Sequence, residues 1–214
     1  MDEDIKDLYR SYEEIKDQIC ARLDDFRCIR NGDCDSLLFD EMAFCIFTPQ
    51  SKAKSCWAAV EELKERELFE KGKADEISDA IKKVRFRNRK ASYFSEARKE
   101  FGVDGRSLRE LLSGMEDSLE AREWLVRNVK GLGYKEASHF LRNIGMGDDI
   151  AILDRHILRN LVRYGVIDEF PSNITASKYM EIEDLMREFS RDIGIPLSHL
   201  DLLLWYRETG EIFK

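Results

Sequence analysis

The sequence contains no long hydrophobic run, and this absence argues against a membrane-spanning helix. No apolar stretch in the 214 residues approaches the roughly 18 residues that a membrane span requires. The first residues, Met1-Asp2-Glu3-Asp4, are acidic where a secretory signal would be basic. We therefore expect a cytoplasmic protein with no membrane partner.

An excess of positive charge is also missing. The chain has 35 Lys and Arg against 43 Asp and Glu, which gives a formal net charge of −8. A protein that binds nucleic acid over its entire surface is strongly basic, so this class is excluded. Any nucleic-acid site must be a local basic patch.

Cysteine pairs with metal-ligand spacing are absent. The 5 cysteines form no CxxC pair, and the C-terminal half has none. A zinc or iron–sulfur site would need thiolates at tight spacings. We expect reduced structural thiols, no metal and no cofactor. The cysteines are Cys20, Cys28, Cys34, Cys45 and Cys56.

Period-two alternation, which is typical of strands, is missing, whereas apolar residues recur at three- and four-residue steps. These steps predict one buried face of a long first helix, formed by Ile5, Leu8, Tyr9, Tyr12, Ile15, Ile19, Leu23 and Phe26. The 3 prolines and several glycines fall where the helical pattern lapses. The sequence predicts an all-α protein of about ten short helices in one body.

Residues 124–141 are predicted to form a helix, a tight turn and a second helix. The turn contains Gly131 and Gly133, which permit positive φ and close backbone approach. Amides at the start of the second helix favour an anion such as a DNA phosphate. A helix connection without any ligand would have the same sequence. Local basic residues favour DNA, and they are Arg122, Arg127, Lys130, Arg142, Arg155, Arg159 and Arg163.

Lys135 falls in the first turn of the second helix. There the helix dipole disfavours an ammonium group, and Lys130 adds like-charge repulsion. A neutral lysine is a nucleophile that can attack a sugar C1′ and form a Schiff base. The alternative is an ordinary solvated lysine.

Asp154 follows the apolar stretch 150–153 and occupies the N-cap position of another helix. Capping alone would explain the residue. A second role is compatible with the cap, because the other carboxylate oxygen can stabilise a positively charged sugar and assist proton movement. Lys135 and Asp154 are therefore a candidate catalytic pair.

The hairpin, the run Gly-Leu-Gly-Tyr-Lys135 and the later Leu-Asp154-Arg-His resemble the helix-hairpin-helix DNA glycosylases. Residues 130–145 and 154–158 are most similar to their second, mostly archaeal class of 8-oxoguanine DNA glycosylase/lyases, and the likeness covers nearly the entire chain. The resemblance implies a base-excision repair enzyme that flips 8-oxoguanine out of duplex DNA. Lys135 would displace the base through a Schiff base and direct strand cleavage by β-elimination, and Asp154 would be the helix-capping catalytic aspartate.

The resemblance also implies two helical lobes with the active site in the cleft between them. Residues 30–135 would form a six-helix lobe that ends in the helix-hairpin-helix, and residues 1–29 with 136–214 would form the second lobe from both chain ends. The partner would be duplex DNA that contains 8-oxoguanine or an abasic site, bound by a monomer.

Three residues match family positions that recognise the damaged base, namely Phe86, Trp205 and the terminal Lys214. Without the resemblance, Lys214 would be part of an ordinary frayed tail. Gln50 falls where glycosylases insert a polar side chain into the gap left by the flipped base, although the preceding proline departs from the expected pattern.

Phe86 lies in the segment 82–90, which has 6 basic residues in 9 and no acid. Arg85, Arg87 and Arg89 suit a surface that follows phosphates beside a stacking ring, although a solvated helix face would have the same composition. Arg155 and His156 are also expected at the DNA, without a catalytic role. Other aromatic residues are expected in the core or at caps, namely Trp57, Trp124, His139 and His199.

Two other functions stay open. A non-catalytic helix-hairpin-helix module would bind duplex DNA in a salt-sensitive way without turnover. A glycosylase of the same fold could instead act on another lesion. A lysine at the helix start paired with a capping aspartate favours an enzyme, because a DNA clamp needs neither.

Overall fold

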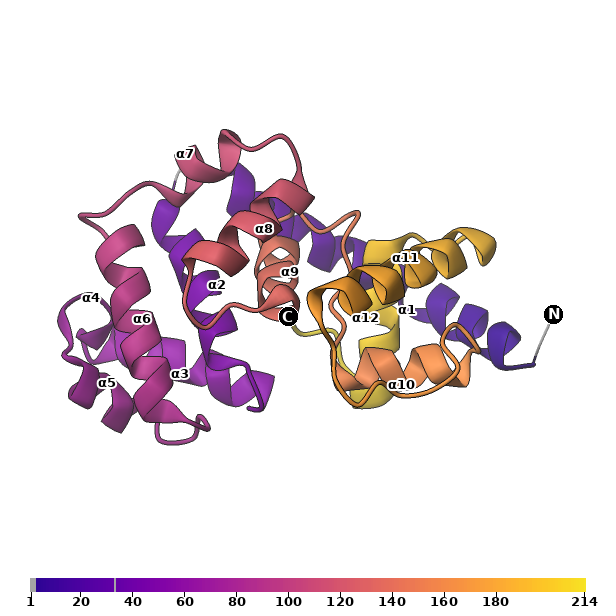
Figure 1. Cartoon of the computed structure of the whole chain (residues 1–214), viewed down its shortest axis with the longest axis horizontal. Coiled ribbons are helices and arrows are strands. Elements are labelled where there is room, and N and C mark those ends of the chain that lie inside the picture. Colours follow the sequence, from indigo (N-terminus) through magenta and orange to yellow (C-terminus); the bar gives the residue numbers. More distant parts are fainter. Residues whose placement is uncertain (1–2, 33) are drawn as a thin grey trace.

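A computed structural model describes residues 3–32 and 34–214. In this described part the chain forms twelve α-helices and no strand, which confirms the all-α class (Figure 1). None of the described helices is long and apolar enough to cross a membrane. The helices are α1 (Glu3–Asn31), α2 (Asp35–Phe47), α3 (Ala53–Glu65), α4 (Leu68–Lys71), α5 (Ala74–Ala80), α6 (Arg87–Phe101), α7 (Leu108–Ser113), α8 (Ser118–Asn128), α9 (Tyr134–Asn143), α10 (Arg155–Arg163), α11 (Ala176–Asp192) and α12 (Leu197–Thr209).

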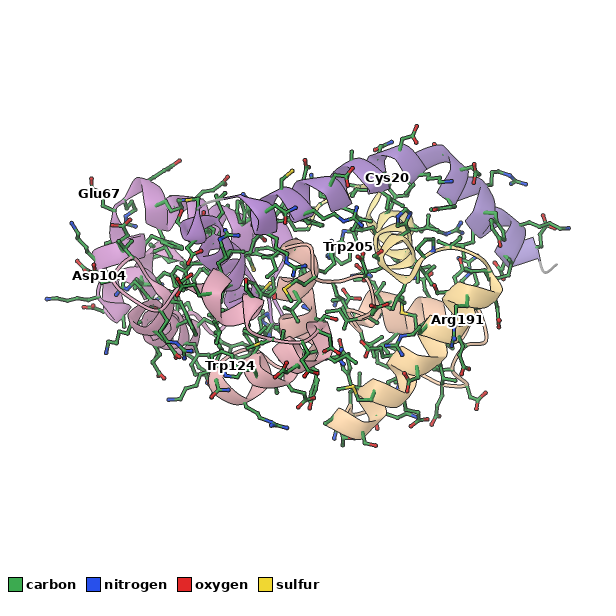
Figure 2. All side chains as sticks on the ribbon, turned by 90° about the horizontal axis from the view of Figure 1, so that it is seen from above. Cys20, Glu67, Asp104, Trp124, Arg191 and Trp205 are labelled. Carbon is green, nitrogen blue, oxygen red and sulfur yellow. The ribbon has the colours of Figure 1, made fainter. Side chains whose placement is uncertain are left out.

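The first helix follows the predicted periodicity. One face of α1 is buried and packs against α9 and α12, because apolar residues three or four apart lie on the same side of a helix. Figure 2 shows α1 running from the N-terminus along one edge of the molecule. The buried side chains are Leu8, Tyr12, Ile15, Ile19, Leu23 and Phe26.

The second helix is buried on all sides and mostly apolar. Every residue of α2 from Leu38 to Phe47 is buried, including Asp40 and Glu41. A helix that is hydrophobic all round belongs in the centre of a core. It packs against α3, α6, α7 and α9 and organises the first of two hydrophobic clusters.

The two clusters come from different parts of the chain. The first contains buried residues between Leu38 and Ile150, and the second contains residues 8–26 together with Ala151 to Leu204. Figure 1 shows α2 to α9 at one end of the molecule and α10 to α12 at the other. Buried residues of α9 belong to the first cluster, beyond the predicted boundary at residue 135. The division into two lobes at that residue stays a prediction.

Two of the cysteines and two of the remaining aromatic residues pack in the core or against it. All five cysteines lie in the described part of the chain and are free thiols, of which Cys45 and Cys56 are buried. His139 is buried with its ring edge against Phe44 at a centroid distance of 5.3 Å. The Trp124 side chain packs against the first cluster. These positions agree with the expected core roles.

Candidate active site

The predicted hairpin is present as α8, a turn and α9. Gly131 has φ +94, and a Cβ at this position would lie 2.7 Å from Cδ2 of Tyr93, so only glycine fits. Gly133 does not use positive φ, because it is the N-cap of α9 with φ −88. No side chain caps α9, which leaves the N–H groups of its first turn available to an anion.

Lys135 is the second residue of α9, as predicted, and its side chain is 25% exposed. Its Nζ lies 3.6 Å from Oε1 of Glu136. Lys130, which was expected to repel Lys135, forms an ion pair with Glu96 at 2.7 Å. Glu96 therefore compensates the charge of Lys130, and the expected repulsion is weaker than the sequence suggests.

Asp154 caps α10, as predicted. Its Oδ1 accepts hydrogen bonds from the backbone N–H of His156 at 2.8 Å and of Ile157 at 2.9 Å. Both of these bonds use the same oxygen, so Oδ2 is outside the cap. The side chain is partly exposed. The residue thus has the geometry that a combined capping and chemical role requires.

The sequence analysis missed a buried carboxyl group, Asp201 on α12, whose pKa is influenced by both residues. Burial raises the pKa of Asp201 to about 6, although the charge of Arg142 acts in the opposite direction. The carboxylate of Asp154 also raises this pKa, and the ammonium of Lys135 lowers it. The hydroxyl of Tyr179 lies 3.3 Å from the backbone nitrogen of Leu153, next to Asp154, and 3.4 Å from Oγ of Ser138, on the helix of Lys135, so the fold brings the two helix starts into the same region. A lone acid within the apolar run 200–204 was the available sequence signal.

Two arginines that were expected to form a basic surface around the hairpin are buried instead. Arg142 lies 3.7 Å from Asp201, and Arg122 pairs with Glu183 at 2.6 Å. Their side chains are 6% and 1% exposed, respectively. The prediction that these two residues add to a basic DNA-facing surface is therefore wrong. Arg155 is exposed, as the expected DNA contact requires.

Phe86 and Gln50 lie on two exposed loops that share a hydrogen-bonding residue. Both have left-handed backbones, with φ 58 for Phe86 and φ 55 for Gln50. Ser51 Oγ, next to Gln50, accepts a hydrogen bond from the N–H of Arg85 at 3.0 Å. The Arg85 guanidinium lies 5.5 Å from the Phe86 ring. A hydrogen bond thus joins the loops of two residues that the family resemblance assigns to DNA or base contact.

Lys90 belongs to the basic segment but lies in the interior. Its Nζ donates hydrogen bonds to the backbone oxygens of Phe47 and Pro49, both at 2.6 Å, and to Ser51 Oγ at 3.1 Å. Burial lowers the pKa of Lys90 to about 8. Lys90 is therefore a member of the basic segment that does not face solvent. Its hydrogen bonds instead hold the loop that contains Gln50.

The other arginines of this segment differ in exposure. Arg85 and Arg89 are exposed, in agreement with a phosphate-facing surface. Arg87 is half-buried, and its Nη1 lies 3.4 Å from Oδ1 of Asp79. Part of its charge is therefore neutralised within the protein.

The C-terminal residues return to the first cluster. The Lys214 Nζ lies 3.6 Å from the centroid of the Trp57 ring and forms an ion pair with Glu41. The side chain of Lys214 is 12% exposed, so the terminus is docked and does not form a frayed tail. Phe213 also packs against this cluster.

Trp205, the other predicted base-reading residue near the C-terminus, contacts His156 on α10. The two rings meet edge to face at 5.3 Å, and Nδ1 of His156 lies 3.3 Å from Oε2 of Glu208. The indole Nε1 of Trp205 is buried without a hydrogen-bond partner in the structure. A buried donor of this kind is available to a ligand.

A cavity of about 1170 Å³ lies elsewhere, next to α2, α4 and α6. Phe39, Phe69 and Val103 are among its lining residues, and neither Lys135 nor Asp154 is. This cavity is therefore separate from the candidate active site.

Comparison with known families gives one consistent match. The model of the family described as 8-oxoguanine DNA glycosylase matches residues 19–195. The 8-oxoguanine DNA glycosylase/AP lyase of Fusobacterium nucleatum is 44% identical over 209 residues, which are 97% of this chain and 96% of the relative. The protein of the same name from Methanocaldococcus jannaschii is 38% identical over 203 residues, 94% of both chains.

Solved structures agree with these sequence matches. The 8-oxoguanine DNA glycosylase of Thermotoga maritima is similar with a TM-score of 0.87 and 34% identity, over 98% of both chains. The M. jannaschii 8-oxoguanine glycosylase/lyase, in complex with 15mer DNA that contains 8-oxoguanine, has a TM-score of 0.88 and 38% identity. That match covers 98% of this chain and 99% of the other.

Proposed function

This chain belongs to the 8-oxoguanine DNA glycosylase family, and from that membership we infer that it excises 8-oxoguanine from duplex DNA as a bifunctional glycosylase and AP lyase. The observation that carries the proposal is a pair of residues: a lysine in the first turn of α9 and an aspartate that caps α10. Tyr179 contacts both Leu153, next to Asp154, and Ser138, on the helix of Lys135, which supports a common site.

In the proposed first step, the neutral Nζ of Lys135 attacks C1′ of the damaged nucleoside. The N-glycosidic bond breaks, and the base leaves with the bonding electrons and takes up the proton that Nζ gives up on bonding to C1′. The carboxylate of Asp154 stabilises the positive charge that develops on the sugar. Opening of the sugar ring at O4′ then gives a Schiff base between C1′ and Lys135.

The Schiff base makes strand cleavage possible in the second step. It withdraws electrons from C2′, so water can take a proton from that carbon, and the C3′–O bond then breaks and expels the 3′ phosphate. Water then hydrolyses the Schiff base and releases Lys135. Cleavage thus requires no nucleophile other than the lysine and water.

We assign DNA binding to three exposed features. The N–H groups at the start of α9, next to Gly131 and Gly133, suit a backbone phosphate. Arg155 and His156 lie beside the Asp154 cap. The third feature is the basic segment with Arg85, Arg87 and Arg89. Such contacts hold DNA regardless of sequence.

Base recognition is assigned to Phe86, Trp205 and Lys214. The exposed ring of Phe86, 55% accessible, suits stacking, and the unpaired Nε1 of Trp205 can donate a hydrogen bond. Gln50, on the loop tied to that of Phe86, would fill the gap left by the flipped base. We propose that the protein acts as a monomer, with lobes that correspond to the two hydrophobic clusters.

Borohydride trapping tests this function. Reduction of the Schiff base should give a stable covalent complex between the protein and a duplex that contains 8-oxoguanine. Lys135→Gln should abolish both trapping and strand cleavage, because an amide cannot form the imine. Denaturing gel electrophoresis measures both products.

Lys130→Gln is the matched control, because Lys130 is a lysine of the same hairpin that pairs with Glu96. This variant should still trap and cleave. A Lys135→Gln protein that still forms the complex would refute the assignment. Salt-sensitive duplex binding without turnover in the unmodified protein would favour a DNA-binding module, and trapping on other lesions would reveal a different specificity.

A further inference from the structure

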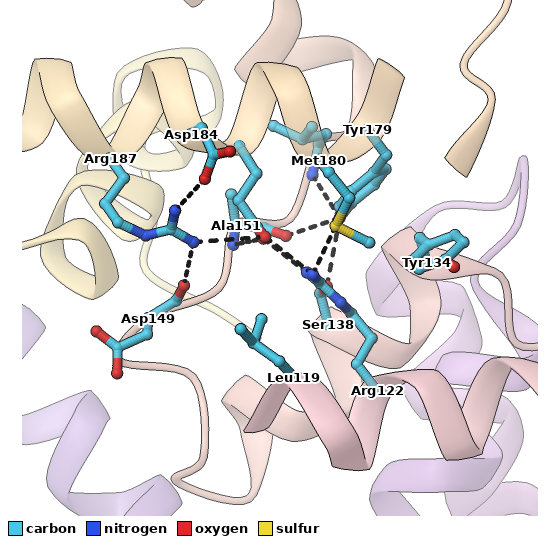
Figure 3. A network of polar contacts seen from close by, with 12 residues as sticks. Leu119, Arg122, Tyr134, Ser138, Asp149, Ala151, Tyr179, Met180, Asp184 and Arg187 are labelled. Atoms are coloured by element: carbon cyan, nitrogen blue, oxygen red, sulfur yellow. Dashed lines mark hydrogen bonds and ion pairs between the residues drawn. The ribbon is translucent and has the colours of Figure 1, made fainter. Parts of the chain in front are cut away.

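A buried polar network connects the hairpin to α11 and to the segment that precedes Asp154 (Figure 3). Its centre is the ion pair between Arg122 on α8 and Glu183 on α11, with N–O distances of 2.6 and 2.9 Å. Glu183 Oε1 also accepts a hydrogen bond from the N–H of Ala151 at 2.7 Å. The network therefore ties helices of the first cluster to the chain segment that leads into α10.

Tyr179 on α11 contacts the same segment at two points. Its hydroxyl lies 2.7 Å from the backbone oxygen of Ala151 and 3.3 Å from the backbone nitrogen of Leu153. A hydroxyl group donates one hydrogen bond and accepts others, so it can satisfy both backbone groups at once. Leu153 immediately precedes Asp154. Tyr179 thus fixes the backbone at the entrance to the catalytic cap.

The same hydroxyl also reaches α9. It lies 3.4 Å from Oγ of Ser138, which is three residues after Lys135 and close to one helical turn away. Ser138 Oγ also accepts a hydrogen bond from Arg122 at 3.2 Å. The Tyr179 ring packs against the ring of Tyr134, the residue before Lys135, at 5.6 Å. One side chain therefore contacts both segments that position the proposed catalytic residues.

Burial makes these contacts restrictive. Tyr179 is 3% exposed, and burial raises its pKa, so the hydroxyl keeps its proton. A polar group that is removed from water and left without a hydrogen-bond partner destabilises the fold. This cost favours the one arrangement in which all groups of the network are paired.

We propose that Tyr179 is a positioning residue that sets the distance between Lys135 and Asp154 by holding the segment 151–153 against α9. The inference rests on the proposed function, because it assigns chemistry to those two residues. Tyr179 itself touches neither sugar nor base in this proposal. It acts on the rate through the geometry of Asp154, since a small misplacement of catalytic groups slows a reaction strongly.

Tyr179→Phe tests the proposal, because it keeps the ring and removes only the hydroxyl. We expect the single-turnover rate of 8-oxoguanine excision to fall by about tenfold or more. The dissociation constant for lesion DNA, measured by fluorescence anisotropy, should stay nearly unchanged. An unchanged rate would overturn the proposal, and so would a loss confined to DNA affinity.

Two other tyrosines provide matched controls. Tyr164→Phe removes a buried hydroxyl that has no partner in the structure. Tyr12→Phe removes a hydroxyl that lies 2.9 Å from Nδ1 of His199, in the same hydrophobic cluster as Tyr179. Both variants should keep the excision rate. If Tyr12→Phe slowed excision as much as Tyr179→Phe at equal loss of thermal stability, the effect would be general destabilisation and the proposal would fail.

A double-mutant cycle with Asp154→Asn identifies the route of the effect. Asparagine also caps helices, so this variant keeps α10 while it removes the charge. If Tyr179 acts through Asp154, Tyr179→Phe should cause little further loss in the Asp154→Asn background. Fully multiplicative losses would contradict the proposed route.

Ser138→Ala is the second variant, and it keeps the test decisive if Tyr179→Phe fails to fold. It removes the contact of Tyr179 with α9 together with the hydrogen bond from Arg122, while Tyr179 keeps its bonds to the segment 151–153. It should lower the same single-turnover rate to a smaller extent; an unchanged rate would then overturn the proposal. Absence of trapping in the unmodified protein would instead remove the proposed function itself, so the two failures are distinguishable.

Discussion

At the scale of single residues, the protonation of Asp201 makes the charge near the candidate active site depend on pH. It is buried on α12, 3.7 Å from Arg142, and its pKa is raised from 3.8 to about 6 because burial disfavours the carboxylate. The charges of Asp154 and Lys135 both act on it. Its protonation therefore changes the electrostatic surroundings of the proposed catalytic pair within the mildly acidic range.

We predict that the contribution of Asp201 to stability is lost as the pH rises through about 6. The folded protein binds this proton more tightly than the unfolded chain, so the stabilisation is complete below pH 3.8. Asp201→Asn should flatten the dependence of the free energy of unfolding on pH between about 4 and 6, as measured by urea denaturation. The exposed Asp148 provides a control as Asp148→Asn, and an unchanged slope in Asp201→Asn would contradict the assignment.

The positions of Lys135 and Asp154 could be predicted from the sequence because both follow from local rules. A glycine turn sets the start of α9, and an aspartate before an apolar run sets the start of α10. The burial of Lys90 and Arg122 could not be predicted in this way. Their partners are distant in sequence, 43 residues away for the Phe47 oxygen and 61 for Glu183. A basic side chain has the same local sequence whether it meets a phosphate or a buried carbonyl.

Among the loops, the segments that precede α3 and α6 behave as one unit. Lys90 Nζ holds the backbone oxygens of Phe47 and Pro49, and Ser51 links the two segments. Gln50 and Phe86 are both exposed on this unit. An interior lysine thus stabilises two strained backbone positions that are proposed to meet DNA.

We predict that Lys90→Met slows 8-oxoguanine excision without changing the number of phosphate contacts. The loops lose their tether, whereas the slope of log affinity against log salt concentration should stay the same. Lys83→Met, at an exposed lysine of the same segment, should instead reduce that slope by about 1. Filter binding at several salt concentrations measures both slopes, and a reduced slope in Lys90→Met would show that Lys90 contacts phosphate after all.

The helices were predictable to different degrees. The buried face of α1 and the hairpin of α8 and α9 follow from periodicity and glycine placement. The break between α3 and α4 does not, because it occurs at Glu67 with φ 57 and no glycine or proline lies there. Local backbone hydrogen bonds from Arg66 to Glu62 and from Glu67 to Lys64 close this turn, and no residue type marks it, so the sequence predicts fewer helices than the structure contains.

Over the full chain, the C-terminus returns to helices that are far away in sequence. The chain leaves the first cluster after Ile150, completes the second, and then brings Phe213 and Lys214 back. The Lys214 ammonium meets Glu41 and the Trp57 ring, contacts that only the folded chain creates. The family resemblance identified Lys214 as a candidate functional residue. The sequence of the C-terminal segment could not predict that its ion-pair partner is Glu41 on α2.

This arrangement separates two roles of the terminal lysine. Because the ammonium is engaged by Glu41, we predict that any recognition of the damaged base by this residue uses its carboxylate or the shape of the docked tail. Appending residues after Lys214 should keep the ion pair but remove the free carboxylate. We predict that this extension lowers the preference for 8-oxoguanine over guanine more than it lowers DNA affinity.

Deletion of Lys214 should have an additional effect. It leaves the carboxylate of Glu41 buried without its cation, which costs on the order of 3 kcal/mol, so the melting temperature should fall together with the preference. The ratio of kcat/KM on 8-oxoguanine and guanine measures the base preference of the two variants. Their melting temperatures measure the stability that the ion pair contributes. Equal discrimination in the extended and unmodified proteins would remove the carboxylate from base recognition, and an unchanged melting temperature on deletion would show that the ion pair does not hold the tail.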